Sequence, residues 1–505
     1  MERWQLITGV VLAYLVVTLV IGIVAGRRAT RGVTGYVAAD RQFGLLAMYF
    51  VIGASVFSAF AFLGGPGWAY SRGMAVLYIL SYGVIGLAPW YFIGPRSARL
   101  GRARGYVTQA QLVTGRFPSR SLSVLMAAIA IIAFIPYVML QMSGAGIVFE
   151  AVTQGNIPFW AGAALAYGVV VLYVLLGGAS AVGWTNVFEG VLMVTVAWIL
   201  GLWLPYELYG GIGPMFDQIA AARPELLTVP GLDSAGNPWT WTAYSTAFLS
   251  SAIGLCMWPH LFMKAFAARD DRTLRRTVVL YPTFQLFLIP LILVGFAGVL
   301  FSSHPENPDF ILPHVLLNTD MPFLMVGLFC AGALAASMST GDALLHGAAS
   351  IAVEDAVAPF VRFSEYAQRR LIQILVVVIG LVAYYFAIVM QPNLVLLLLT
   401  AYAFIDQLAP PVYAALYWKR ATTAGVLSGL FGGMATAVLF VLRPGLRPMG
   451  IHEGILGLIV NVALLVMVSH MTRPQNDEHA SGFLAIARGL RKKGPGPTHD
   501  PGPRQ

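Results

Sequence analysis

The 505-residue chain is poor in charged residues and in cysteine. Only 10% of its residues are Asp, Glu, Lys or Arg, whereas 58% are hydrophobic, and the mean hydropathy is +0.75. A soluble core cannot bury so much apolar surface, so the composition indicates a polytopic, all-helical membrane protein. The two cysteines, Cys256 and Cys330, fall in apolar stretches, which argues against a disulfide framework and against a zinc site.

The sequence also lacks the residue clusters that catalysis or nucleic-acid binding requires. We find no nucleophile near a base and oxyanion donors, no metal-ligand spacing and no phosphate-binding loop, and therefore expect no enzyme. The formal net charge of +9 comes largely from short loops between apolar stretches, so we expect no nucleic-acid partner. The expected partners are a lipid bilayer and a small-molecule substrate, with no obligate protein partner evident.

Apolar runs long enough to cross a hydrocarbon core of about 30 Å recur along the whole chain. The first ends at Arg27 and Arg28 and lacks both a basic start and a small-residue cleavage site, so it is predicted to be a retained helix. In all, the sequence predicts about thirteen transmembrane helices, near 5–26, 43–70, 74–95, 122–151, 157–176, 184–207, 239–263, 276–302, 321–350, 368–391, 394–418, 422–442 and 451–472.

Basic residues distinguish the two sides of the predicted membrane. The loops after odd-numbered spans hold most of them, including Arg28, Arg102, Lys264 and Arg370, and the C-terminal tail is basic as well. The opposite loops hold only Arg3, Arg72, Arg223, Arg443 and Arg447. The positive-inside rule then predicts a plasma (inner) membrane protein with its N-terminus outside and its C-terminus in the cytoplasm.

The stretch 332–345 (GALAASMSTGDALL) combines small residues, hydroxyls and one carboxylate in a predicted span. Small residues let helices approach closely, and hydroxyls supply hard oxygen ligands. An ionised residue at the centre of a membrane helix costs about 2.5 to 3.5 kcal/mol on insertion scales, so Asp342 is a functional candidate. The alternative is an ordinary packing helix.

Two predicted spans contain closely spaced Gly and Pro residues, which interrupt helices. The second span contains 64–67 (GGPG), and the seventh contains Gly254 followed by 258–260 (WPH). Broken helices at membrane depth are tolerated where they line a cavity, and a pair of them at corresponding positions indicates a transporter built from inverted repeats. Proline kinks in a packed bundle are the alternative.

Five motifs carry a family resemblance. They are GASVFS at 53–58, GGPG at 64–67, GGASAVGWTN at 177–186, ASMST at 336–340 and PPVYAALYWKR at 410–420. In this order, over roughly residues 5–472, they resemble the sodium/solute symporter family, which includes proline, sugar, sialic-acid, pantothenate and monocarboxylate carriers.

The resemblance implies a LeuT-like fold, with an inverted 5+5 repeat, one extra N-terminal helix and two extra C-terminal helices. The chain would then divide into an N-terminal helix and loop (1–42), a first repeat (43–207), an external loop (208–238), a second repeat (239–418), two further helices (419–472) and a partly disordered cytoplasmic tail (473–505). The external loop is interpreted as a cover over an entrance or as a linker, and 483–493 as a basic amphipathic helix on the membrane surface.

The resemblance also implies a sodium ion as the cofactor, and it implies the ligands of that ion. They are the carbonyls of Ala54, Phe57 and Ala336 with the hydroxyls of Ser339 and Thr340. A cage of oxygens with little formal charge can bind sodium weakly enough to release it. The two hydroxyls could instead bond back to the preceding helical turn.

The second candidate ion site departs from the family pattern. The aspartate of the W-T-D signature is Asn186 in this chain, whereas Asp342 stands where some members have a serine. A second sodium or a proton could therefore use Asp342 with Asn186 and Ser339, or these residues could form a strut between helices. Glu189 could contribute or could lie at the cytoplasmic surface.

The predicted substrate cavity lies between the two broken helices, with no Lys or Arg clearly within it. Its candidate residues are Phe57, Ser58, Tyr137, Gln141, Ser143, Tyr244, Ser251, Trp258, His260, Tyr402, Asp406 and Gln407. A helix N-terminus could still hold a carboxylate there. The motifs at 64–67, 137–141 and 258–260 look most like the carboxylate-transporting branch, so the sequence predicts sodium-coupled symport of a short-chain monocarboxylate.

Other functions remain open at this point. Proline-type amino acids, pantothenate and sugars are alternative substrates, although Val56 replaces an aspartate of the proline permease. A proton-coupled carrier of the same fold would use Asp342 and Asp406. A solute-sensing module is the alternative of another class, and it would need a separate signalling partner because the tail is short.

Overall fold

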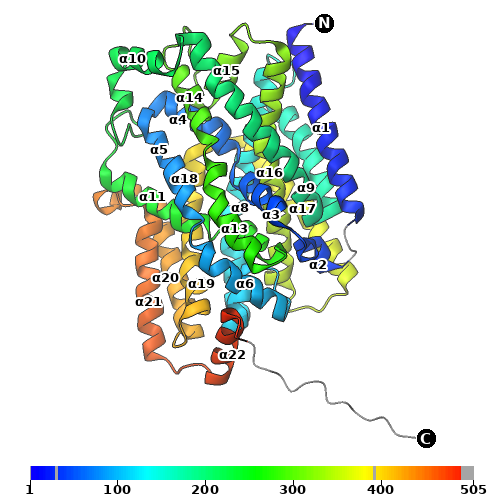
Figure 1. Cartoon of the computed structure of the whole chain (residues 1–505). Helices are drawn as coiled ribbons and strands as arrows, with labels where there is room; N and C mark the ends of the chain where they lie inside the picture. Colours follow the sequence, from blue (N-terminus) through cyan, green and yellow to red (C-terminus); the bar gives the residue numbers. More distant parts are fainter. Residues whose placement is uncertain (1, 29–31, 391–393, 491–505) are drawn as a thin grey trace, which may run out of the picture.

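The computed structural model describes residues 2–28, 32–390 and 394–490, with backbone only at 28 and 394–397, and this part of the chain is almost entirely helical (Figure 1). Its only extended pairings are two isolated bridges, Phe43 with Ala268 and Leu232 with Pro238. The α-helices are α1 (Arg3–Arg28), α2 (Val33–Ala38), α3 (Leu45–Val56), α4 (Gly65–Arg72), α5 (Leu77–Gly86), α6 (Trp90–Arg104), α7 (Gln109–Arg116), α8 (Arg120–Val152), α9 (Phe159–Tyr209), α10 (Ile212–Ala222), α11 (Trp241–Leu255), α12 (Pro259–Ala267), α13 (Asp271–Gln285), α14 (Leu288–Ala297), α15 (Ile311–Leu317), α16 (Phe323–Ile351), α17 (Glu365–Met390), α18 (Leu394–Ile405), α19 (Ala409–Tyr417), α20 (Thr423–Leu442), α21 (Glu453–Met471) and α22 (Asp477–Arg488).

The all-helical membrane fold predicted from the sequence is confirmed. Each predicted span overlaps one of these helices or a consecutive pair. By length and composition, nine helices of the described residues could cross a membrane, or ten if the bent pair 45–56 and 60–86 counts as one span. The exact number of thirteen stays a prediction, because several spans are split by turns and two are merged within α9.

Helix α9 merges two predicted spans. Its 51 residues would extend about 75 Å if straight, more than twice the thickness of a hydrocarbon core. Gly178 interrupts it with φ 51° and ψ −139°, a conformation open essentially only to glycine. A Cβ there would lie 2.5 Å from the Tyr36 carbonyl oxygen, so both backbone shape and space require glycine.

The two predicted helix breaks are present. Helix α3 ends at Val56, Phe57 has extended backbone, and the chain resumes at 62° to its former direction through a π-helical turn at Phe60–Gly64. The first break therefore precedes the GGPG motif. Helix α11 ends at Leu255 and α12 begins at Pro259, whose fixed φ suits the first turn of a helix.

Helix α16 lies at the centre of the bundle. Its residues from Cys330 to Ile351 are all buried, and it packs on α1, α3, α8, α9 and α17. The small side chains predicted to allow close approach therefore lie on a helix that is enclosed by its neighbours. This packing brings its hydroxyls and its carboxylate next to α3 and α9.

The segment predicted as an irregular external loop is partly helical. It contains α10 and a 3-10 turn at Pro224–Leu227, and it folds back onto the residues that follow α4. A Cβ at Gly73 would meet the Leu226 carbonyl at 1.9 Å, which shows how tightly the two segments pack. Figure 1 shows α10 at the same end of the bundle as the N-terminus.

The predicted surface helix at 483–493 is helical over 483–488, but it begins earlier and lies against the protein. Helix α22 spans Asp477–Arg488 and packs on α6, with Phe483 and Ala487 fully buried. Arg99 donates to the Ala487 carbonyl at 3.1 Å, so the helix is fixed to the protein. Residues 494–505, which are predicted to be disordered, lie outside the described residues, as do 491–493 of the predicted surface helix.

Candidate functional site

Four of the five predicted sodium ligands converge where α3 ends beside α16. The Ser339 hydroxyl lies 3.0 Å from the Ala54 carbonyl oxygen and 3.3 Å from the Ala336 carbonyl oxygen. The Thr340 hydroxyl lies 3.4 Å from the Ala54 carbonyl and 3.3 Å from the Ser55 carbonyl. All of these residues are fully buried.

The break in α3 explains why the carbonyls are available. The last helical hydrogen bond of α3 runs from the Phe57 N–H to the Gly53 carbonyl, so the next carbonyls have no donor in their own helix. Hydroxyl and carbonyl oxygens without formal charge are suitable ligands for sodium, and this donor set fits that ion. The carbonyl of Phe57, the fifth predicted ligand, belongs to the broken segment, but the described hydrogen bonds do not link it to the other four oxygens.

Asp342 lies one turn beyond Ser339 and is fully buried against α9. One carboxylate oxygen accepts hydrogen bonds from Tyr173 at 2.8 Å and from Thr185 at 3.2 Å. The other oxygen has no hydrogen-bond partner in the described part of the chain. Asp342 is thus a buried carboxylate with one satisfied oxygen and one unsatisfied oxygen.

Asn186 does not hydrogen-bond to Asp342 in this structure. Its amide donates to the Ser55 hydroxyl at 2.9 Å, which ties α9 to the last turn of α3. Glu189, one turn along α9, is fully buried and accepts a hydrogen bond from Tyr14 at 3.0 Å. The alternative that Glu189 lies at the cytoplasmic surface is therefore wrong.

The prediction that Lys264 lies in a cytoplasmic loop is wrong. Helix α12 continues to Ala267, and Lys264 is one of its buried residues. Together with His260 and His346 it lines a cavity of about 10 Å³, which has room for about one water molecule. Ala343, the neighbour of Asp342, lines the same cavity, so the Lys264 side chain lies near the candidate ion site.

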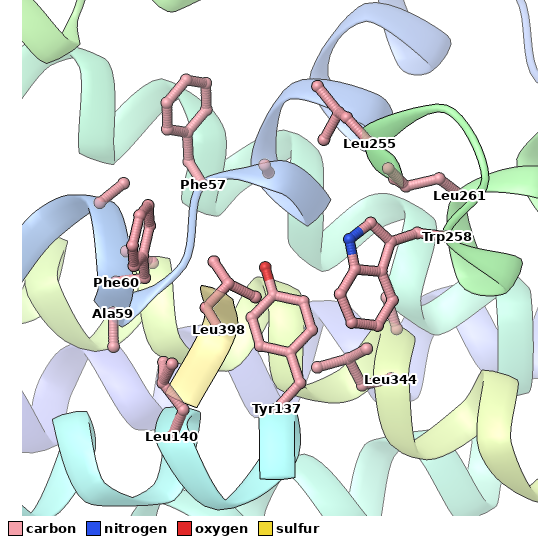
Figure 2. Packing of buried hydrophobic residues seen from close by; sticks show 14 of the residues in the cluster. Phe57, Ala59, Phe60, Tyr137, Leu140, Leu255, Trp258, Leu261, Leu344 and Leu398 are labelled. Carbon is pink, nitrogen blue, oxygen red and sulfur yellow. The ribbon is translucent and has the colours of Figure 1, made fainter. Parts of the chain in front are cut away.

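The two helix breaks face each other across a group of aromatic and amide side chains. Gln141 on α8 accepts a hydrogen bond from the Ala59 N–H at 2.9 Å, next to the first break. The rings of Tyr137 and Trp258 lie 4.8 Å apart, and those of Trp258 and Tyr402 lie 5.7 Å apart. Figure 2 shows the rings of Tyr137 and Trp258 next to each other, with the Phe57 ring directed away from them.

Two buried donors beside the breaks are unsatisfied. The amide nitrogen of Gln141 and the indole nitrogen of Trp258 find no acceptor among the residues that the structure describes. Gln141 is fully buried and Trp258 is 1% exposed. An unpaired buried donor costs about 1 to 3 kcal/mol, so each of them would gain from a partner with an acceptor oxygen.

The remaining predicted substrate residues lie in different places. Ser58 accepts from the Phe60 N–H at 3.2 Å, and Asp406 accepts from Ser250 while its second oxygen lies beside Gly254. Ser143 has no hydrogen-bond partner within the described ranges. Tyr244 lies apart from the breaks, in an aromatic cluster with its ring 5.3 Å from Trp239 and 6.5 Å from Tyr78.

The chain matches known transporters along nearly its whole length. The family model described as the sodium:solute symporter family matches residues 36–433. An uncharacterized symporter of Bacillus subtilis, YhjB, is 28% identical over 92% of this chain and 96% of its own. A monocarboxylate transport permease of Rhizobium johnstonii is 26% identical, covering 90% of this chain and 95% of the relative. The sodium/pantothenate symporter of Escherichia coli is equally similar at 26%, covering 89% and 93%.

A solved structure shares the fold. It is the substrate-bound, outward-open state of a Na⁺-coupled sialic acid symporter, with a TM-score of 0.77 and 17% identity, covering 93% of this chain and 98% of that chain. The family and the named relatives are transporters, which confirms the expectation that the protein is not an enzyme. The chain therefore belongs to the sodium:solute symporter family and has its LeuT-like fold.

Proposed function

We propose that this sodium-coupled symporter carries a small organic anion, most simply a short-chain monocarboxylate. The observation that supports this proposal best is the pair of buried, unsatisfied donors on Gln141 and Trp258 beside the helix breaks. A carboxylate offers several acceptor sites and would satisfy both donors. The 26% identity to a monocarboxylate permease is in keeping with it, although the pantothenate symporter is equally similar.

The coupling proposed here rests on the junction of α3 and α16. The ion would bind the carbonyls of Ala54 and Ala336 and the hydroxyls of Ser339 and Thr340, with the Phe57 carbonyl as a further ligand. Ion binding would then fix the end of α3, whose next residues lie against the proposed solute position at Gln141. Two ligands that favour the same arrangement of one element bind cooperatively, which couples their fluxes.

The domain layout and the membrane orientation belong to the same proposal. Residues 43–207 and 239–418 would form the two inverted repeats, each with a break in its first helix. The N-terminus and α22 lie at opposite ends of the bundle, as an odd number of spans requires (Figure 1). The excess of Arg and Lys in the loops at the α22 end favours the cytoplasm on that side.

Asp342 supports a second candidate, coupling to a proton or to a second cation. Asp342, whose second oxygen is unsatisfied, lies one turn from Ser339 on α16. The buried carboxylate of Glu189 lies on α9, one turn beyond Thr185. Thr185 and Tyr173 hold the carboxylate in place, so it would need no large movement to bind a cation. A carrier driven only by protons would use Asp342, with Asp406 as the other candidate carrier.

Uptake into proteoliposomes tests the substrate. We expect an inward sodium gradient to drive accumulation of labelled pyruvate, lactate or acetate, and not of proline, pantothenate or a sugar. Trp258→Phe, which removes the indole N–H and keeps an aromatic ring, should raise the KM for the acid by about tenfold. Trp198→Phe on the exposed side of α9 is the matched control. Accumulation of pantothenate or proline instead would overturn the monocarboxylate assignment.

A further inference from the structure

A cavity of about 370 Å³ opens on the outer surface of the bundle, where α13 packs against α3 and α6 (Figure 1). This volume is within the usual range for small-molecule sites. Leu45 begins α3, Tyr91 lies in the first turn of α6, and α13 supplies the other lining residues, which are Arg275, Arg276, Val279 and Leu280. The four residues of α13 are all exposed. We call this hollow the Arg275 cavity.

The Arg275 cavity lies at the predicted boundary of the membrane. The predicted spans near 43–70 and 276–302 begin beside it, and the span near 74–95 ends there. From Thr277 to Ala297, α13 and α14 extend about 30 Å, which is the thickness of a hydrocarbon core. Arg275 and Arg276 therefore lie at the level where the phosphates of the lipids begin.

The two guanidinium groups of the cavity have no anionic partner in the protein. Within the described ranges, no carboxylate lies within 4.0 Å of Arg275 or Arg276. The Arg275 guanidinium lies 5.5 Å from the centroid of the Tyr91 ring. Arg96, on the same helix as Tyr91, is different, because it donates to the Leu416 carbonyl at 3.1 Å. The two arginines of α13 thus keep their donors for a group outside the protein.

The acidic residues that precede these arginines in the chain are engaged elsewhere. Asp271, one turn before Arg275, forms ion pairs with Arg99 at 2.6 Å and with Arg102, so its charge is opposed by two guanidinium groups. Asp270 caps the first turn of α13 and pairs with a neighbouring arginine. None of the lining residues is acidic. The lining of the Arg275 cavity therefore carries two positive charges and no negative charge.

Exposed apolar side chains continue from the arginines toward the centre of the predicted membrane. Val279 and Leu280 follow Arg275 and Arg276 by one turn and lie on the same face of α13. Leu46 and Phe92, the neighbours of the other two lining residues, are exposed as well. The cavity thus combines a basic end with an apolar flank, which is the arrangement of a phospholipid in reverse charge.

We infer that the Arg275 cavity binds an anionic phospholipid, with its phosphate at Arg275 and Arg276 and its acyl chains along Val279 and Leu280. Guanidinium groups bind phosphate oxygens in a bidentate geometry, and basic pockets between transmembrane helices suit anionic headgroups. A zwitterionic headgroup binds less well, because its ammonium group is repelled by the arginines. The bound lipid joins α3, α6 and α13. This site is independent of the solute that the protein carries.

Native mass spectrometry of the purified full chain tests the binding. We expect phosphatidylglycerol to bind more tightly than phosphatidylethanolamine with the same acyl chains. Arg275→Gln with Arg276→Gln should raise the dissociation constant for phosphatidylglycerol by at least about tenfold, since each basic residue near an anionic headgroup contributes about fivefold. Arg272→Gln with Arg362→Gln is the matched control, because it removes two other exposed arginines, which do not line the cavity. The control should bind phosphatidylglycerol as the wild type does.

Thermal unfolding in detergent gives an independent measure. A ligand that binds only the folded state stabilises that state. Added phosphatidylglycerol should therefore raise the unfolding temperature of the wild type and of the control, and not that of Arg275→Gln with Arg276→Gln. Arg275→Lys with Arg276→Lys keeps the charge without the planar fork, so it should still prefer phosphatidylglycerol but bind it more weakly than the wild type.

Three results would overturn the inference. The first is equal affinity of the wild type for phosphatidylglycerol and phosphatidylethanolamine. The second is an unchanged dissociation constant for phosphatidylglycerol in Arg275→Gln with Arg276→Gln. The third is displacement of phosphatidylglycerol by an equal concentration of soluble glycerol 3-phosphate, which would assign the site to a free phosphate compound and not to a lipid.

Discussion

The Ser339 hydroxyl lies 3.0 Å from the carbonyl oxygen of Ala54 and donates to it, which joins α16 to the last turn of α3. That carbonyl has lost its helical donor because α3 breaks at Phe57. Ser339 of α16 thus supplies a hydrogen bond to a carbonyl at the broken end of α3. A cation placed between the two oxygens would stabilise the same junction.

Ser339→Ala should weaken sodium activation of transport. Removing one of the few oxygens of the proposed cage should raise the half-saturating sodium concentration by at least about tenfold, because each ligand contributes roughly 1.5 kcal/mol or more. Sodium-dependent uptake, measured over a range of sodium concentrations, checks this. Ser350→Ala is the matched control, since Ser350 is buried on the same helix and has no hydrogen-bond partner in the described residues. Equal sodium dependence in the two variants would refute the ligand assignment.

Asp342→Asn distinguishes a cation-binding role of Asp342 from a purely structural role. The amide oxygen can still accept the Tyr173 and Thr185 hydrogen bonds, so we expect the protein to fold. Loss of the charge should lower cation affinity by about tenfold or more if the carboxylate binds sodium or a proton. Cation-dependent uptake by the wild type and by Asp342→Asn measures this, with Asp320→Asn on the surface as control. An unchanged cation affinity would leave Asp342 with a structural role.

The all-helical fold could be predicted from the sequence because it depends on local signals, whereas the sodium ligands rest on the family resemblance and stay a prediction. Long apolar runs define spans, and the small residues around Ser339 and Thr340 mark the helix that approaches α3. The partners of Asp342 could not be predicted in the same way. Apolar spans show little periodicity, so no pattern of residues predicts the rotation of α9 that turns Thr185 toward Asp342 and Asn186 toward Ser55. Lys264 was misplaced because a charge near the end of an apolar run usually marks a loop, whereas α12 extends one turn past it.

Gly178→Ala should destabilise the protein. The new methyl group would meet the Tyr36 carbonyl at 2.5 Å, and φ 51° with ψ −139° is strained for any residue with a Cβ. We expect a loss of at least about 2 kcal/mol of stability. Thermal unfolding in detergent measures it. Gly168→Ala on the same helix meets nothing within 4 Å and should be neutral or stabilising, because alanine favours helix. Equal unfolding temperatures for the two variants would contradict the assigned backbone conformation.

The proposed orientation can be tested with introduced cysteines. Ala235→Cys in the exposed segment before α11 should react with a membrane-impermeant maleimide in intact cells. Ser364→Cys in the exposed segment before α17 should react only after the membrane is permeabilised. The wild type is the control, because Cys256 and Cys330 are buried. The reverse pattern would place the N-terminus in the cytoplasm.

The most direct test of the central claim, sodium coupling at the α3–α16 junction, is uptake of labelled pyruvate into proteoliposomes under either an inward sodium gradient or an equal inward proton gradient. The wild type, Thr340→Ala and Asp342→Asn are compared side by side. The proposed mechanism predicts accumulation driven by sodium and abolished by Thr340→Ala. Accumulation driven only by protons, unaffected by Thr340→Ala and lost in Asp342→Asn, would contradict it.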